Sequence, residues 1–134
     1  ICDCGIGLGD TLFEIYLQSL DIDKKFSFTG IEKQKVYLDF IEEKLIHLWK
    51  GNLNLINGDI MNQDYSNYNI IYSYSPFNNR RQLEKMYKKI ISEIKPESII
   101  IENANYGRGH FNLLDEMSGL EKISLQTCYV YKKI

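Results

Sequence analysis

The chain has 134 residues, enough for one domain with a single hydrophobic core. Hydrophobic residues make up 44% and charged residues 25%, as in ordinary globular domains, and no apolar run reaches the roughly 18 residues that a membrane-spanning helix needs. The net charge of −2 disfavours a broad nucleic-acid-binding face but leaves room for a local basic patch. An odd, sparse set of three cysteines is typical of a reducing compartment, so we expect a cytoplasmic protein without a membrane segment.

Two of the cysteines, Cys2 and Cys4, alternate with Asp3 in a strand-like segment and therefore point to the same face. No His or further Cys lies near them in sequence, so they are a poor zinc signature and we predict no metal site. The chain does not begin with Met and opens inside this strand-like segment. We therefore expect an N-terminal part upstream of Ile1.

Strand and helix patterns alternate along the chain. Asp10 or Thr11 can cap the first helix, and a second helix is expected over residues 34–49. Strands are expected over residues 1–4, 25–31, 53–57, 69–74 and 98–102, and further helices over 81–94 and 111–117. The last two strands, 121–125 and 128–132, are too close in sequence for a parallel crossover and must form an antiparallel hairpin. This pattern predicts one α/β domain over residues 1–134, with a doubly wound, mostly parallel sheet.

A glycine-rich turn follows the first strand, in the run Ile1-Cys2-Asp3-Cys4-Gly5-Ile6-Gly7-Leu8-Gly9. Closely spaced glycines let the backbone turn sharply and approach a ligand, because no Cβ stands in the way. The start of the following helix offers free N–H groups to acceptor atoms. The turn therefore predicts binding of a nucleotide or nucleoside.

The spacing of these glycines separates two kinds of nucleotide site. A dinucleotide fingerprint has the form Gly-x-Gly-x-x-Gly, but here Asp10 stands in the third position and Gly9 comes one residue early. With Asp3 two residues before Gly5, the run resembles the first motif of class I S-adenosylmethionine-dependent methyltransferases. The resemblance implies a Rossmann-like fold, S-adenosylmethionine as cofactor, and a cofactor site that includes Asp3, Gly5, Gly7 and Gly9.

The resemblance continues at later strand ends, from residue 1 to about residue 132. Glu32 ends the second strand, where a carboxylate accepts hydrogen bonds from ribose hydroxyls, although an NAD-binding domain would carry the same acid. By likeness to the family, Asp59 would accept from the adenine amino group and Ile60 would pack on its ring. Tyr74 stands in the fourth motif, beside the cofactor's transferred methyl group.

That fourth motif departs from the family pattern. Amino-group methyltransferases often carry Asn-Pro-Pro followed by Tyr or Phe, whereas here Tyr74 and Ser75 replace the Asn and the first Pro. Pro76 and Phe77 agree with the pattern. The missing Asn argues against transfer to a nucleobase or amide nitrogen, so a small molecule or a protein side chain is the favoured acceptor. Nucleic acid is not excluded, and the oligomeric state stays open.

The residues beyond the fifth strand complete the predicted acceptor site. In α/β sheets ligands bind at the carboxyl ends of the strands, where the segment 103–110 lies. We predict Tyr74 and His110 as catalytic residues, because a hydroxyl can hold the acceptor and a histidine can deprotonate it. Tyr74 could equally be a core or rim aromatic. Ser75, Pro76, Phe77 and Tyr106 are the predicted substrate-binding residues.

Three alternatives to a methyltransferase stay open. A nicotinamide-dependent oxidoreductase would share the fold and Glu32, but the glycine spacing argues against it. A nucleoside-binding protein without catalytic activity would keep Asp3, Glu32 and Asp59 while losing the fourth motif. A polyamine synthase would need acidic residues around the fourth strand, and residues 69–81 contain none.

Overall fold

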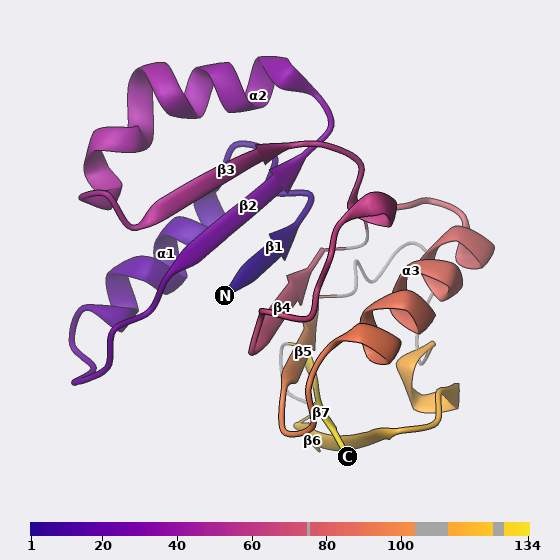
Figure 1. Cartoon of the computed structure of the whole chain (residues 1–134). Helices are drawn as coiled ribbons and strands as arrows, with labels where there is room; N and C mark the ends of the chain where they lie inside the picture. The colour runs from indigo at the N-terminus through magenta and orange to yellow at the C-terminus, as the bar shows by residue number, and fades with distance from the viewer. Residues whose placement is uncertain (75, 104–112, 125–127) are drawn as a thin grey trace. The chain divides into compact units, whose positions relative to one another are not determined.

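The computed structural model describes the whole chain except residues 75, 104–112 and 125–127 (Figure 1). Its described residues form two compact units, Ile1–Ile60 and Met61–Ile134. Within the described residues, no helix is both long and apolar enough to cross a membrane.

The first unit is built on three parallel strands in the order β3-β2-β1. The register pairs Cys2 with Thr29 and Phe28 with Leu53, so the three strands end at the same edge. Its elements are β1 (Cys2–Cys4), α1 (Asp10–Ser19), β2 (Phe28–Glu32), α2 (Lys35–Phe40), the π turn η1 (Ile41–Leu45), the 3-10 turn η2 (Ile46–Trp49), β3 (Leu53–Asn57) and, across the boundary between the units, η3 (Ile60–Asn62).

One hydrophobic cluster holds the helices of the first unit to its sheet. Leu12 and Tyr16 of α1 pack with Phe28 of β2, Leu38 of α2 and the nearly buried Trp49. The ring centroids of Tyr16 and Trp49 lie 5.1 Å apart, and Phe28 meets the Tyr16 ring edge-on. Such offset and edge-on aromatic pairs add to the stabilisation that burial alone gives. This cluster holds α1 and α2, the helices that follow β1 and β2, against the sheet.

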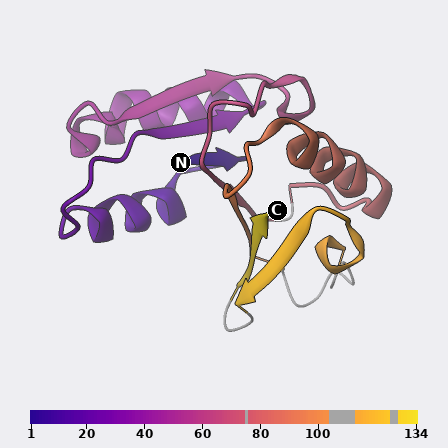
Figure 2. The same ribbon diagram turned by 60° about the horizontal axis from the view of Figure 1, so that its bottom comes forward.

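The second unit contains a four-stranded mixed sheet in the order β4-β5-β7-β6. Its elements are β4 (Ile70–Ser73), α3 (Arg80–Glu93), β5 (Ile99–Glu102), η4 (Leu114–Glu116), β6 (Leu120–Ser124) and β7 (Tyr129–Lys133). β4 and β5 are parallel, whereas β7 runs antiparallel to both β5 and β6 (Figure 2). The structure thus confirms the α/β prediction of a mostly parallel sheet that ends in an antiparallel hairpin.

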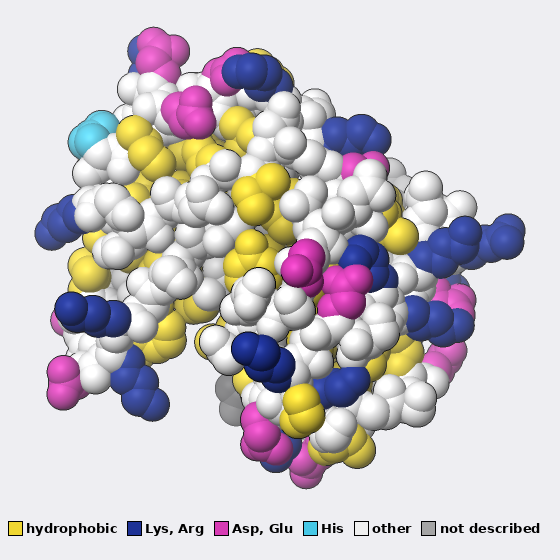
Figure 3. Space-filling model, in the orientation of Figure 1, with side chains coloured by type: hydrophobic (Ala, Val, Ile, Leu, Met, Phe, Trp, Pro, Cys, Tyr) yellow, Lys and Arg dark blue, Asp and Glu magenta, His cyan; other side chains and the backbone are white. Residues whose placement is uncertain are grey.

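Helix α3 begins where its sequence provides a cap. The side chain of Asn79 accepts hydrogen bonds from the backbone N–H groups of Arg81 and Gln82, in the first turn of the helix. Leu83, Met86 and Ile90 lie on its buried face. Its outer charges pair with each other, as Lys88 does with Glu84, so basic and acidic side chains lie together over α3 in Figure 3.

One local expectation from the sequence was wrong, and another was confirmed only in part. Asp10 does not cap α1, because Gly9 is the capping residue and no side chain accepts a hydrogen bond there. The chain is helical over nearly all of the expected range 34–49, but it is an α-helix only as far as Phe40 and then widens into η1 and tightens into η2. Trp49 is buried after this change, while Val36 and Leu48 are exposed.

Candidate cofactor site

The glycine turn after β1 is open on its ligand-facing side. Gly5, Gly7 and Gly9 all have positive φ angles, of 92°, 56° and 81°. A Cβ at Gly9 would touch Ile6 and Ile41 at ordinary distances of 3.5 Å, whereas a Cβ at Gly7 would meet no atom within 4 Å. The backbone at Gly7 therefore borders open space, as a turn that receives a ligand requires.

The turn is held down by Ile6, which packs across β2. The backbone N–H groups of Gly5 and Ile6 both donate to the carbonyl oxygen of Ile31 at 3.0 Å. Ile6 is only 5% exposed, and a Cβ at Gly30 would lie 2.2 Å from its Cδ1 atom. Gly30 is therefore the residue that lets Ile6 seat the turn against the sheet, a role that the sequence alone did not indicate.

Glu32, the predicted ribose-binding residue, is fixed by two backbone groups. Its Oε2 accepts a hydrogen bond from the N–H of Gly7 at 3.1 Å, and its Oε1 accepts one from the N–H of Gln34 at 2.8 Å. Each carboxylate oxygen can accept a second hydrogen bond. Glu32 is therefore oriented beside the glycine turn and retains acceptor capacity for a pair of hydroxyl groups.

Asp3 is a buried acid at the base of the same turn. It is only 3% exposed and pairs in register with Gly30 of β2. Burial raises the pKa of Asp3 to about 7, and the negative charges of Asp10 and Glu32 add to the effect. The turn is thus surrounded by carboxylates, and a positively charged ligand group there would favour the ionised form of Asp3.

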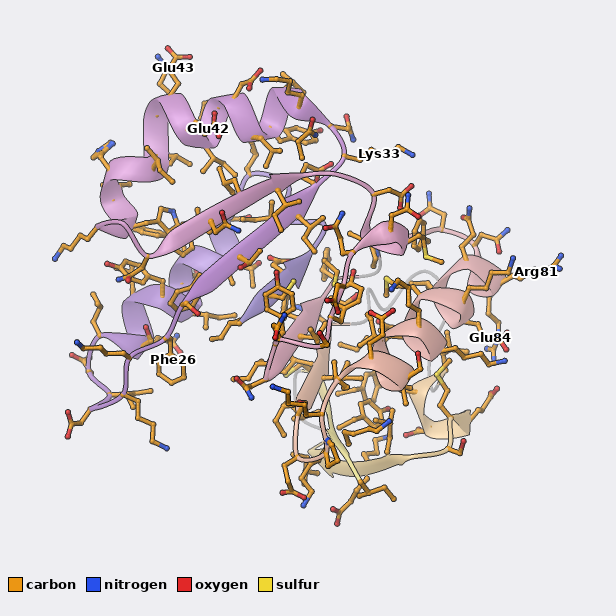
Figure 4. The ribbon with its side chains drawn as sticks, in the orientation of Figure 1. Phe26, Lys33, Glu42, Glu43, Arg81 and Glu84 are labelled. Atoms are coloured by element: carbon orange, nitrogen blue, oxygen red, sulfur yellow. The ribbon has the colours of Figure 1, made fainter. Side chains whose placement is uncertain are left out.

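The predicted adenine-binding residues follow β3 and lie next to Glu32. The carbonyl oxygen of Glu32 accepts hydrogen bonds from the N–H of Gly58 and from Nδ2 of Asn57, both at 3.0 Å. These bonds tie the end of β3 to the end of β2. Asp59 forms an ion pair with Lys33 at 3.3 Å, and Ile60 is nearly buried (Lys33 is labelled in Figure 4). All seven predicted cofactor residues of this unit therefore lie in or directly after the three strand ends.

Cys2 and Cys4, the buried cysteines on either side of Asp3, do not belong to a group of possible metal ligands among the described residues. Contact with Cys4 and burial both raise the pKa of the Cys2 thiol, which keeps it protonated. Among the residues that the structure describes, no group of three or more His, Cys, Asp or Glu side chains could hold a metal ion.

The predicted acceptor residues belong to the second unit and are only partly described. Tyr74 follows the last residue of β4 and is 51% exposed, while Pro76 and Phe77 are half-buried. Ser75, Tyr106 and His110 lie outside the described residues. The roles predicted for these residues, which are catalytic, substrate-binding or, for Tyr74, also cofactor-binding, therefore stay predictions.

The structure also reveals a buried acid that the sequence analysis missed. Glu102 is the last residue of β5 and is 1% exposed, with the hydroxyl of Tyr87 bonded to it at 3.0 Å. An acid at the end of an otherwise apolar strand was the available signal. Its partner lies 15 residues away on α3, however, and that proximity is a product of the fold.

The units and the glycine turn together make the fold that defines class I S-adenosylmethionine-dependent methyltransferases. No model of a protein family matches the sequence, and no curated protein matches it either. Solved structures of these methyltransferases match essentially the whole chain, which shows that the chain has the class I methyltransferase fold, including its Rossmann-like, mostly parallel sheet.

Three of these structures illustrate the likeness. TehB from Haemophilus influenzae has a TM-score of 0.74 and 15% identity, with 99% of this chain and 57% of that chain covered. The N-methyltransferase NodS from Bradyrhizobium japonicum has a TM-score of 0.72 and 9% identity, over 98% and 84%. An RNA methyltransferase from Salinibacter ruber, solved with S-adenosyl-L-homocysteine, has a TM-score of 0.64 and 14% identity, over 98% and 77%. Identities this low show the fold alone.

Proposed function

We propose that this protein is an S-adenosylmethionine-dependent methyltransferase that holds the methyl donor against the strand ends of its first unit. The observation that carries the proposal is the hydrogen bond between Gly7 and Glu32. It joins an open glycine turn to an oriented carboxylate that has acceptor capacity left. A buried acid, Asp3, lies at the base of the same turn.

The parts of the donor match the parts of this site. Glu32 can accept from both ribose hydroxyls, and Asp59 and Ile60 follow β3 where they can hold the adenine by its amino group and its ring. The donor carries a positive ammonium group and a positive sulfonium group, which suit the carboxylates of Asp3, Asp10 and Glu32. A nicotinamide dinucleotide has no such cationic amino-acid end and carries a pyrophosphate, which Asp3 and Asp10 beside the glycine turn would repel.

Methyl transfer itself asks little covalent chemistry of the protein. The bond from the methyl carbon to the sulfonium sulfur breaks as a bond to the acceptor forms, and S-adenosylhomocysteine leaves with the electron pair. Catalysis can therefore come from positioning the two reactants in line and from excluding water. In this proposal the acceptor lies against Tyr74, Pro76 and Phe77, and His110 and Tyr106 come from the segment after β5.

The acceptor in this proposal is a small molecule or a protein side chain. Position 74 has Tyr in place of the Asn that receives an amino group in related enzymes, and Tyr74 is half exposed. The outer charges of α3 are largely paired with acids, as in Arg80–Glu116 and Lys88–Glu84, and so offer little to a polyanion.

Calorimetric titration tests the cofactor. S-adenosylmethionine and S-adenosylhomocysteine should each bind with a stoichiometry of one, and NAD and NADP should bind far more weakly. Equal or tighter binding of NAD would overturn the proposal in favour of an oxidoreductase.

A transfer assay with radiolabelled methyl donor tests the acceptor. The protein is offered total RNA, a protein extract and a small-molecule extract in parallel, each with a boiled-enzyme control. Label should appear in the protein or the small-molecule pool. Label in RNA alone would refute the acceptor class, and tight cofactor binding without transfer to any pool would favour a non-catalytic binding protein.

A further inference from the structure

Three buried polar side chains of the second unit meet where β4 and β5 end. Ser73 and Glu102 are the last residues of the two strands and pair in register, so their side chains share one face of the sheet. Tyr87 of α3 places its hydroxyl 3.0 Å from Oε1 of Glu102 and 3.2 Å from Oγ of Ser73. The three residues are at most 1% exposed.

The chemistry of these groups sets the direction of the hydrogen bonds. A phenol has one proton, and the carboxylate of Glu102 is the nearer and stronger acceptor, so Tyr87 donates to Glu102. The hydroxyl of Ser73 then donates to the oxygen of Tyr87. Each bond in such a chain polarises the next, which strengthens the set in a buried environment.

The backbone of Ser73 is held at the same point. Its carbonyl oxygen accepts a hydrogen bond from the N–H of Asn103, the residue after β5, at 2.9 Å. Ser73 is thus fixed through its side chain by α3 and through its backbone by the residue that follows β5. The next residue, Tyr74, is half exposed and has left the sheet.

We propose that Ser73, Tyr87 and Glu102 form a buried positioning triad that sets where the chain leaves β4 and hence where Tyr74 meets the methyl acceptor. The inference rests on the proposed function for its acceptor-facing part. The triad touches neither reactant and acts through the backbone at Ser73. It therefore explains why an apolar strand ends in a buried acid.

Three features of the surroundings of Glu102 act on its pKa. Burial raises its pKa, the hydrogen bond from Tyr87 opposes that rise, and the charge of Asp115 adds to it. Asp115 itself is bound by Lys122 and by the hydroxyl of Tyr131. Replacement of Glu102 by Gln keeps an acceptor oxygen for Tyr87 whatever the charge state of the acid.

The test compares three variants of the whole chain. Tyr87→Phe removes the central hydroxyl, and Glu102→Gln is the conservative variant that should keep the chain of bonds. Tyr131→Phe is the matched control, because Tyr131 is also a buried tyrosine and its hydroxyl also bonds a carboxylate, that of Asp115 at 2.9 Å. Hydrogen exchange by mass spectrometry is read over residues 74–79, alongside the affinity for S-adenosylmethionine.

Tyr87→Phe should speed amide exchange in residues 74–79 by about threefold to tenfold, the scale of one lost hydrogen bond. Glu102→Gln should stay within about twofold of the original protein, as should Tyr131→Phe in this segment. Affinity for S-adenosylmethionine should be unchanged in all three. With the acceptor from the radiolabel assay, Tyr87→Phe should raise the acceptor's KM more than it changes kcat.

Equal exchange over residues 74–79 in Tyr87→Phe and Tyr131→Phe would overturn the triad. Faster exchange with unaltered acceptor KM and kcat would overturn its acceptor-facing role. Failure of the unaltered protein to bind S-adenosylmethionine is a separate result. It would overturn the proposed function. It would not overturn the role of the triad in fixing the end of β4, because the exchange measurement needs no cofactor.

Discussion

The backbone N–H of Gly7 donates a hydrogen bond to Oε2 of Glu32 at 3.1 Å, across 25 residues of sequence. The bond joins the turn after β1 to the last residue of β2, and Gln34 holds the other carboxylate oxygen. A bound ribose would therefore meet a carboxylate that is already oriented, so little ordering would be needed on binding. The proposed function gives Glu32 a second role, toward the ligand, which mutation can separate from its role toward the turn.

Replacement of Glu32 by Ala should weaken S-adenosylmethionine binding by roughly 1–3 kcal/mol, the scale of lost hydrogen bonds to a charged group. Glu32→Gln should lose less, because one oxygen still accepts from the N–H of Gly7. Calorimetric titration measures both. Glu42→Ala is the control, since Glu42 is an exposed acid of η1 (Figure 4). An affinity of Glu32→Ala equal to that of Glu42→Ala, with the fold intact, would remove Glu32 from the site.

Gly7 and Gly51 are a matched pair of glycines that can test how closely the ligand approaches the backbone at Gly7. Both have positive φ, 56° and 81°, and a methyl group at either would meet no protein atom within 4 Å. Each change to Ala should therefore cost a similar 1–2 kcal/mol or so of folding free energy through backbone strain. Only Gly7→Ala should also weaken S-adenosylmethionine binding, by about tenfold or more, if the ligand approaches the backbone there. Urea unfolding and calorimetry measure the two effects, and equal affinities would contradict the placement.

The parts of the fold that local patterns encode were predictable. Residues 53–57 are bounded by Gly51-Asn52 and Gly58-Asp59, and the structure has a strand at Leu53–Asn57. The two-residue gap in the C-terminal pair forced an antiparallel hairpin, which β6 and β7 form. In the candidate site, the sequence placed the glycine turn, Glu32 and Asp59 at the ends of successive strands, and this predicted that they lie near one another. The strand and the hairpin depend on residues close in sequence, and the site depends on parallel strands that end at one edge of the sheet, so patterns in the sequence indicate both.

Features that depend on packing were not predictable. The helix over residues 34–49 had a sound apolar period, but η1 and η2 replace its second half because Trp49 packs on Tyr16 and Phe28. Propensity and period give way there to tertiary contacts. The partners of Glu102 and the contact between Ile6 and Gly30 likewise join residues far apart in sequence. No spacing rule indicates them.

Gly30→Ala should destabilise the protein by about 1–3 kcal/mol, because the new methyl group would overlap Ile6 and force it to move. Ile6→Ala alone should cost roughly 2–4 kcal/mol through lost burial. In the double variant the overlap is relieved, so Gly30→Ala should cost much less in the Ile6→Ala background. A double-mutant cycle by urea unfolding measures this coupling, and strictly additive effects would contradict the contact.

Two buried tyrosines should respond to loss of the hydroxyl in opposite ways. Among the described residues, Tyr16 has no hydrogen-bond partner for its buried hydroxyl, whereas Tyr87 bonds Ser73 and Glu102. Tyr16→Phe should therefore leave the free energy of unfolding unchanged or raise it by about 1 kcal/mol, since an unsatisfied polar group is removed. Tyr87→Phe should lower it by about 1 kcal/mol or more. Urea unfolding measures both, and a clear loss of stability in Tyr16→Phe would show that its hydroxyl has a partner.

The raised pKa of Asp3 predicts a particular pH dependence of stability. Its folded pKa is about 7, whereas an unfolded Asp titrates near 3.9, so between these values the folded state holds more protons at this site. The contribution of Asp3 is therefore most favourable below about pH 4, is lost as pH rises toward 7, and is constant above that. Asp3→Asn removes this titration. The stability of Asp3→Asn relative to the original protein should thus rise from pH 5 to pH 7, by at most about 1.4 kcal/mol per pH unit, and then level off.

Asp64→Asn is the control for this measurement. Hydrogen bonds from the backbone and side chain of Ser66 lower the pKa of Asp64, so its titration lies below the pH range of interest. The difference in stability between Asp64→Asn and the original protein should therefore be flat from pH 5 to pH 8. Urea unfolding at each pH gives both curves. A flat curve for Asp3→Asn as well would mean that Asp3 is fully ionised throughout this range, and that the carboxylates around the glycine turn do not hold a proton at neutral pH.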